Sequence, residues 1–184
     1  MKRIADLAIA LIGLPLALPV ILACMALVKS SSRGPAIFCQ TRVGLNEKPF
    51  TCYKLRTMYV ETGNAPSHQV AASSVTPVGR WLRRLKLDEL PQLWNIVRGE
   101  MSFVGPRPCL PSQVELVEAR RARGLYAIRP GITGVAQIAG IDMSDPERLA
   151  RRDAEYLQDM SLSTDLRLIA LTVLGAGRGD RVRT

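Results

Sequence analysis

Residues 7–28 read LAIALIGLPLALPVILACMALV, and this run of 22 residues contains no charged side chain. At a rise of about 1.5 Å per residue, a helix of this length extends roughly 33 Å, enough for the hydrocarbon core of a bilayer. Lys2 and Arg3 precede the run and Lys29 follows it, so basic residues flank both ends and give no clear direction of crossing. The run predicts a membrane-inserted segment over residues 1–30, followed by a single domain over residues 31–184.

Two prolines, Pro15 and Pro19, lie within the apolar run. Each removes a backbone donor and crowds the preceding helical turn, so we expect a break near Pro19. A re-entrant helix-break-helix segment and a proline-kinked helix that crosses the membrane once both satisfy these residues. A cleaved signal peptide fits poorly, because the run is longer than such a peptide needs and Asp6 stands at its start.

The composition of the chain limits the kinds of molecule that it is expected to bind. The 184 residues allow one ordinary domain, and 25 Lys and Arg against 16 Asp and Glu give a net charge of +9. Such a basic chain should attract phosphate groups, nucleic acid or anionic lipid. Aromatic residues make up only 5%, too few for a platform that stacks on bases, so we expect no nucleic acid.

The cysteines and the one histidine carry no recognisable metal or catalytic motif. The cysteines show no C-x-x-C spacing, which indicates a reducing compartment and no disulfide framework; they are Cys24, Cys39, Cys52 and Cys109. His68 stands in a polar stretch, and we expect an ordinary loop residue.

Beyond the apolar run, the pattern predicts an α+β fold that is mostly helical. Partial period-two alternation over residues 36–43 and 50–58 indicates a small antiparallel β-hairpin. Residues 60–77 lack periodicity, which is typical of a loop that covers a site or of a surface loop without a role.

The rest of this part is expected to be helical with short connections. Apolar spacing over residues 79–98 predicts two short helices, with Asp88 as the cap of the second and Pro91 in its first turn. Further expected elements are a loop at 99–108, a turn at 129–131 and helices at 112–123, 145–160 and 165–174. The last of these helices, with the arginine-rich tail 178–184, fits either the membrane surface or the core and a frayed terminus.

Asp88 and Glu89 stand at the predicted joint between the two short helices. Adjacent residues on a helix project about 100° apart, so their carboxylates are expected to have different tasks. Basic residues, Arg83 among them, and a helix N-terminus could keep Asp88 ionised and hold a phosphate beside it. Such a carboxylate suits a nucleophile or a Mg²⁺ ligand, whereas the same pattern also fits a cap carboxylate paired with surface arginines.

Five motifs resemble one family in sequence order. They are QTRVG at 40–44, YKLRTM at 53–58, LDELPQLWN at 87–95, RGEMSFVGPRP at 98–108 and RPGITG at 129–134. Together they closely resemble the signature of the bacterial sugar transferases, the monotopic phosphoglycosyl transferases. The resemblance extends to the anchor, where Pro19 matches the helix break of the family.

The resemblance implies a membrane enzyme that moves a sugar 1-phosphate from a UDP-sugar to undecaprenyl phosphate, releases UMP and so begins surface glycan assembly. It implies that Asp88 attacks the phosphate to give a covalent phosphosugar intermediate, and that Glu89 assists through the metal or as a base. Lys54, Arg83 and Arg107 match positions that contact the phosphates, and Mg²⁺, held by Asp88 and Glu89, is the expected cofactor. The expected location is the bacterial inner membrane with the catalytic domain facing the cytoplasm.

The sequence also fits two other classes of protein. One is a membrane-tethered basic module that binds anionic lipid or nucleic acid, and the other is an inactive scaffold that recruits glycan enzymes. The sequence also leaves open whether the chain forms a homodimer and which sugar it uses.

Overall fold

The computed structural model describes residues 2–62 and 70–177. His68, part of the 60–77 loop and the 178–184 tail therefore lie outside the described residues. The helices are α1 (Lys2–Ser31), α2 (Pro77–Arg84), α3 (Gln92–Arg98), α4 (Val114–Arg121), α5 (Val135–Ile138), α6 (Pro146–Gln158) and α7 (Leu162–Val173). The strands are β1 (Ile37–Val43), β2 (Pro49–Leu55), β3 (Ser102–Val104) and β4 (Gly131–Thr133). The predicted α+β, mostly helical class is confirmed.

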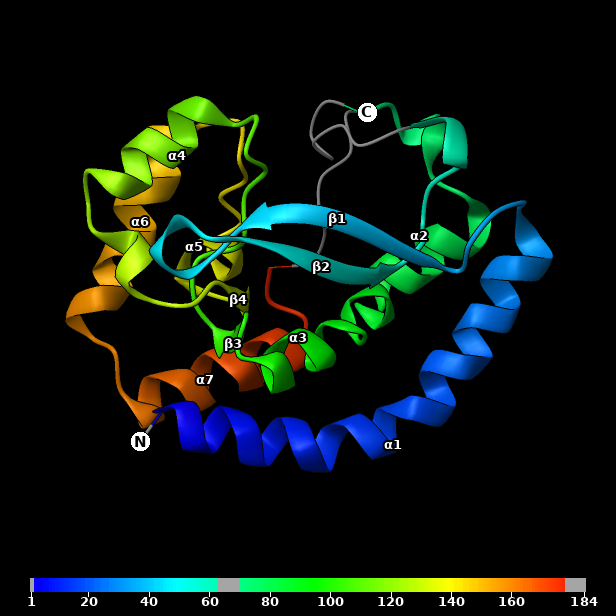
Figure 1. The fold of residues 1–184 in the computed structure, drawn as a ribbon, viewed down its shortest axis with the longest axis horizontal. Helices are drawn as coiled ribbons and strands as arrows, with labels where there is room; N and C mark the ends of the chain where they lie inside the picture. Colours follow the sequence, from blue (N-terminus) through cyan, green and yellow to red (C-terminus); the bar gives the residue numbers. More distant parts are fainter. Residues whose placement is uncertain (1, 63–69, 178–184) are drawn as a thin grey trace.

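The predicted hairpin is confirmed. Strands β1 and β2 pair antiparallel, with Ile37 opposite Leu55 and Val43 opposite Pro49. In Figure 1 the hairpin crosses the middle of the molecule, with α4, α5 and α6 toward one end and α2 toward the other. The hairpin thereby connects the two ends of the molecule.

Helix α1 contains the whole apolar run. It is the one helix in the described ranges, 2–62 and 70–177, that is long and apolar enough to cross a membrane. Pro15 and Pro19 lie inside it, so the predicted break is wrong as an interruption of the helix. The ribbon instead bends within α1 before it meets β1 (Figure 1). A bend rather than a break is a common outcome for proline, because neighbouring turns can keep their hydrogen bonds around it.

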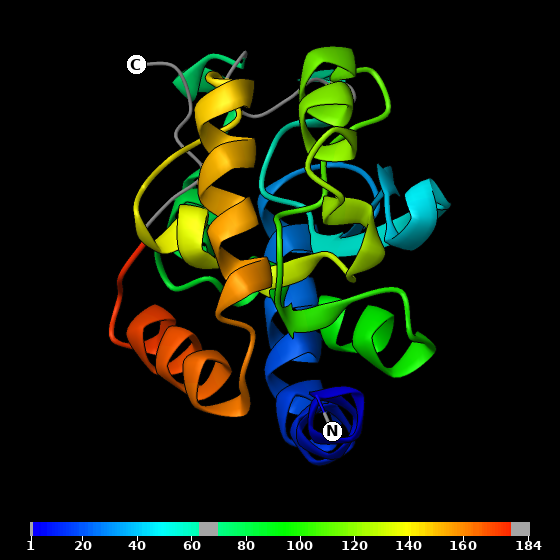
Figure 2. The same ribbon diagram turned by 90° about the vertical axis from the view of Figure 1, so that its left-hand side faces the viewer.

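Both ends of α1 contact the same body. At the N-terminal end, Lys2 Nζ lies 2.6 Å from Asp165 Oδ2 of α7. Figure 2 shows the first part of α1 nearly end-on, with α7 beside it. At the other end, Val28 is buried in a cluster that includes Leu55 of β2 and Leu82 of α2. A straight helix of 30 residues would separate its ends by about 45 Å, so the bend is what returns the chain to the domain.

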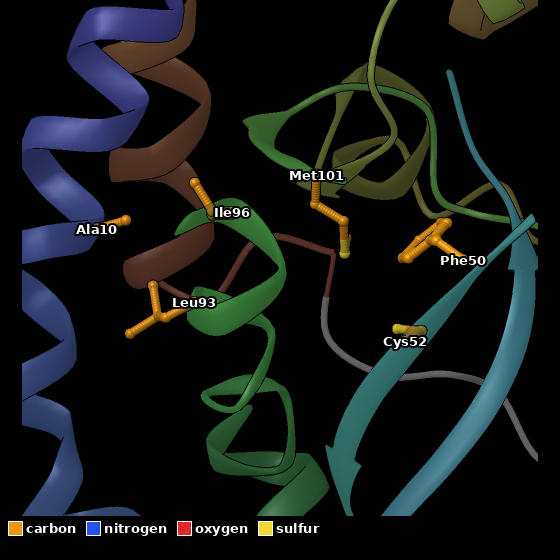
Figure 3. Packing of buried hydrophobic residues seen from close by; sticks show 6 residues of the cluster. All are labelled: Ala10, Phe50, Cys52, Leu93, Ile96 and Met101. Atoms are coloured by element: carbon orange, nitrogen blue, oxygen red, sulfur yellow. The ribbon is translucent and has the colours of Figure 1, made fainter. Parts of the chain in front are cut away.

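The core between α1 and the hairpin is apolar. Ala10 of α1 packs in one cluster with Leu93 and Ile96 of α3, and Phe50 and Cys52 of β2 complete it together with Met101 (Figure 3). Burial of these side chains joins the anchor helix to the strand that carries Lys54. The cysteines Cys24, Cys39, Cys52 and Cys109 are free thiols.

The structure contains a second small sheet that the sequence did not predict. Strands β3 and β4 pair parallel, with Ser102 opposite Gly131 and Val104 opposite Thr133. The expected loop at 99–108 and turn at 129–131 are therefore wrong in part, because three residues are too few to show a period-two pattern. Parallel pairing between distant segments leaves no hairpin signal in the sequence either.

Helices α4, α6 and α7 follow the predictions with shifted ends, whereas α5 was not predicted. Asp145 caps α6, since its side chain accepts a hydrogen bond from the Arg148 backbone N–H. Helix α7 begins earlier than predicted and is capped by Ser161. It buries Leu168 but exposes Leu162 and Leu166. Both alternatives for this helix, contact with the membrane surface and a place in the core, stay predictions.

Candidate active site

Asp88 and Glu89 lie in a one-turn 3-10 helix, η5 (Leu87–Glu89), between α2 and α3. Lys86 before it has a left-handed backbone, with φ of 56°, which ends the preceding helix. The second helix begins only at Gln92, so the prediction that Asp88 caps it is wrong. Pro91 has no N–H to continue an α-helix back toward Leu87, and this accounts for the separate short turn.

The turn places the two carboxylates in different surroundings. Asp88 is buried, with only 7% of its surface exposed. Glu89 is paired with two cations at one oxygen: Arg107 Nη2 lies 2.8 Å and Lys54 Nζ lies 3.3 Å from Oε1. All three side chains of this cluster are largely shielded from water, so their charges interact more strongly than at an open surface.

Lys54 is brought to this cluster by strand β2. Asn95 of α3, fully buried, ties that strand to the helix that follows Glu89. Its Oδ1 accepts from Tyr53 N–H at 3.1 Å, and its Nδ2 donates to Thr51 C=O at 2.7 Å. These bonds fix the strand beside η5, and with it the distance between Lys54 and Glu89.

Arg107 is presented by the segment that follows β3. Gly105 begins this segment and donates its N–H to Thr133 C=O at 2.9 Å. A Cβ atom at Gly105 would lie 2.4 Å from Arg129 C=O, so only glycine fits. Farther on, Pro108 C=O accepts from Arg42 Nη1 of β1 at 2.9 Å. The segment is therefore attached both to the small parallel sheet and to the hairpin.

Arg83 has a different environment from the other predicted phosphate ligands. Its Nε donates to Thr57 Oγ1 at 2.9 Å, and its Nη1 is buried without a hydrogen-bond partner among residues 2–62 and 70–177. A buried guanidinium nitrogen needs an acceptor, and a phosphate oxygen would supply one. A direct interaction of Arg83 with Asp88 stays a prediction.

Asp88 and Glu89 are the two carboxylates at η5 that would hold Mg²⁺. Within the described ranges, no group of three or more His, Cys, Asp or Glu side chains could hold a metal ion. Mg²⁺ commonly uses one or two carboxylates and completes its shell with water and substrate phosphates. Asp88 and Glu89 can provide those two carboxylates.

Two buried polar side chains near the site, Asn95 and Arg120, were not predicted to have a role. Asn95 stands inside the motif at 87–95, but nothing in its spacing indicated a bond to β2. Arg120 of α4 lies four residues after buried Leu116, so its position on the inner helix face was the one available signal.

The chain is similar in sequence to known bacterial proteins over most of its length. The model of the family described as bacterial sugar transferase matches residues 1–178. The chain is 41% identical to undecaprenyl-phosphate glucose phosphotransferase of Komagataeibacter xylinus, covering 94% of this chain and 35% of that protein. It is 39% identical to uncharacterized sugar transferase EpsL of Bacillus subtilis (strain 168), covering 94% and 85%. It is also 40% identical to UDP-glucose:undecaprenyl-phosphate glucose-1-phosphate transferase of Caulobacter vibrioides, covering 94% and 68%.

The chain belongs to the bacterial sugar transferase family, as its five motifs predicted. It spans about a third of the Komagataeibacter relative and most of the Bacillus and Caulobacter ones.

Proposed function

We propose that the chain is a phosphoglycosyl transferase that moves a sugar 1-phosphate from a UDP-sugar to undecaprenyl phosphate and releases UMP. The names of relatives such as the Caulobacter protein support the donor and acceptor classes. The observation that carries the proposal is the cluster at η5, where Glu89 pairs with Lys54 and Arg107 directly beside buried Asp88. Formation of an undecaprenyl-diphosphate sugar would begin the assembly of a surface glycan.

Asp88 is the proposed nucleophile. One oxygen of its carboxylate forms a bond to the phosphorus that bears the sugar. The bond from that phosphorus to the bridging oxygen of the diphosphate breaks, and its electron pair leaves with UMP. The product of this half-reaction is an aspartyl phosphosugar.

The lipid phosphate resolves the intermediate in the second half-reaction. An oxygen of undecaprenyl phosphate bonds to the same phosphorus, and the bond to Asp88 breaks to return the carboxylate. UMP leaves before the lipid reacts, so one phosphate-binding site serves both half-reactions.

The cations supply electrostatic stabilisation for both steps. Charge in phosphoryl transfer spreads over the phosphate oxygens, so positioned cations lower the barrier. Lys54, Arg83 and Arg107 are the proposed phosphate contacts. Glu89 holds Lys54 and Arg107 in place through its Oε1. Mg²⁺, bound by Asp88 and Glu89, would neutralise part of the charge on the diphosphate.

We further propose a membrane arrangement, which the two docked ends of α1 support. Because Lys2 and Val28 both contact the domain, an anchor that enters and leaves on one face of the membrane is favoured over a helix that spans it. We place that face on the cytoplasmic side of the inner membrane, where UDP-sugars are made. The exposed leucines of α1, Leu11 and Leu16 among them, would then meet lipid.

The experiment is turnover by the full-length protein in detergent with Mg²⁺, undecaprenyl phosphate and a panel of UDP-sugars, with UMP as the readout. The proposal expects sustained UMP release with at least one donor, and none with Asp88→Ala. A basic lipid-binding module would instead show salt-sensitive vesicle binding that does not depend on Asp88. The absence of UMP release across the panel would contradict the proposal.

A further inference from the structure

A buried ion pair lies behind the loop that carries Arg107. Arg120 Nη2 of α4 donates to Asp153 Oδ2 of α6 at 2.7 Å, and each side chain is only 2% exposed. Burial raises the pKa of Asp153, while Arg120 lowers it. Removing two charges from water is unfavourable, and apolar side chains of similar volume often fill such a space with equal or greater stability. The pair therefore calls for a role other than holding two helices together.

The second terminal nitrogen of Arg120 supplies that role. Its Nη1 donates to the backbone C=O of Arg107 at 2.6 Å. Pro106 and Pro108 flank Arg107 and have no N–H. The backbone on either side of Arg107 can therefore form hydrogen bonds only through its carbonyl groups. Arg120 thus fixes the backbone of Arg107, whose side chain extends to Glu89 Oε1 at 2.8 Å.

The guanidinium group suits this task because it is planar and directs its donors in a fixed geometry. One terminal nitrogen is held by Asp153, and the other then points at the Arg107 carbonyl. A lysine ammonium is a compact charge on a flexible stem and cannot hold both acceptors in the same geometry.

We propose that Arg120, oriented by Asp153, is a positioning residue that holds Arg107 at the distance from Glu89 and the substrate phosphates that the reaction needs. The test of this role by kcat/KM rests on the proposed function. Arg120 itself touches neither the substrate nor the reacting atoms, and it acts through the backbone of Arg107.

The test replaces the pair by apolar residues in the full-length protein, as Arg120→Met with Asp153→Leu. The proposal expects an unfolding midpoint close to that of wild type and a fall in kcat/KM of about 10- to 100-fold, since small misplacements of a catalytic group have effects of that size. It also expects faster amide hydrogen exchange in the peptide over residues 101–113. Arg121→Met is the matched control, because Arg121 is the neighbouring arginine of α4 and pairs with Glu47 at the surface. The Arg121→Met variant should keep the kcat/KM and the amide hydrogen exchange of wild type.

A mutant cycle separates positioning from a structural role. In an Arg107→Ala background, the apolar pair should reduce kcat/KM by no more than about threefold, because the group that it positions is already gone. An equal loss in both backgrounds would contradict the proposal. If the apolar pair prevents folding, Arg120→Lys takes its place, and wild-type kcat/KM and exchange in that variant would overturn the inference.

The exchange readout keeps this inference separate from the proposed function. If the wild-type protein releases no UMP from any donor, the proposed function fails, but the exchange of residues 101–113 still tests the positioning. Unchanged exchange in the apolar-pair variant would contradict the positioning whether or not the enzyme is active.

Discussion

Arg107 Nη2 donates to Glu89 Oε1 across 2.8 Å and thereby joins the loop after β3 to the short turn η5. Lys54 of β2 lies 3.3 Å from the same oxygen. Three separate segments therefore meet at one carboxylate, immediately beside Asp88. In the proposed mechanism Glu89 organises these cations, and Asp88 is the nucleophile.

Replacement of Glu89 by glutamine tests the role of Glu89 in holding Lys54 and Arg107. The amide in Glu89→Gln has nearly the same shape but no charge to hold two cations, so we expect kcat/KM for UMP release to fall by about 100- to 1000-fold, as for loss of other electrostatic groups. Glu115→Gln, an exposed carboxylate on α4, is the matched control and should retain full activity. A Glu89→Gln enzyme as fast as wild type would remove Glu89 from the account.

Asn95 is expected to be important for stability as well as activity. Asn95→Leu leaves Tyr53 N–H and Thr51 C=O without their partner, and these orphaned, partly buried groups together cost about 1–3 kcal/mol. Chemical denaturation should show a loss of that order in the free energy of unfolding, with a lower kcat because β2 carries Lys54. Gln158→Leu, an exposed amide at the end of α6, should change stability by less than about 0.5 kcal/mol. Equal effects of the two substitutions would contradict the role given to Asn95.

Asp6 fastens the N-terminal end of α1 to the domain. Its carboxylate accepts from Ser102 Oγ at 2.8 Å and from Phe103 N–H at 3.2 Å. Asp6→Ala should therefore lower the free energy of unfolding by about 1–3 kcal/mol, whereas Ser102→Ala, which removes only one of the two bonds, should cost about 1 kcal/mol. Unfolding in detergent, followed for both variants, measures the difference. An Asp6→Ala protein no less stable than Ser102→Ala would argue against this attachment.

Tyr156 should make stability depend on alkaline pH. Burial and its hydrogen bond to Asp165 raise the pKa of Tyr156 above the ordinary value of 10.0. The folded protein keeps the phenol proton where the unfolded chain loses it, so the free energy of unfolding should fall as the pH rises above about 10. The contribution is present below that pH and has a slope of up to about 1.4 kcal/mol per pH unit. Denaturation curves for wild type and Tyr156→Phe should diverge in slope there, and identical slopes would refute the assignment.

Local patterns predicted the hairpin and the two-helix joint because alternation and proline act on neighbouring residues. The cap at Asp88 was wrong because the left-handed backbone of Lys86 and the proline at 91 create a separate turn, which helical spacing does not reveal. The β3–β4 pairing was missed because each strand has three residues and the two are distant in sequence.

The site itself was only partly predictable from the sequence. Lys54 and Arg107 stand 35 and 18 residues from Glu89, so their association came from resemblance to a family and not from spacing. The Arg120–Asp153 pair depends on how α4 packs against α6, and an arginine on a short helix gives little indication of burial. Tertiary packing determines such contacts, and the folded structure is needed to find them.

In the proposed mechanism Asp88 becomes bonded to phosphorus during the reaction. The most direct measurement is the intact mass of the full-length protein after incubation with Mg²⁺ and a UDP-sugar that supports turnover, in the absence of undecaprenyl phosphate. Wild type should gain the mass of one phosphosugar group and release one UMP per chain, while Asp88→Asn should do neither. An Asp88→Asn protein that acquires the same mass, or that turns over as quickly as wild type, would contradict the account.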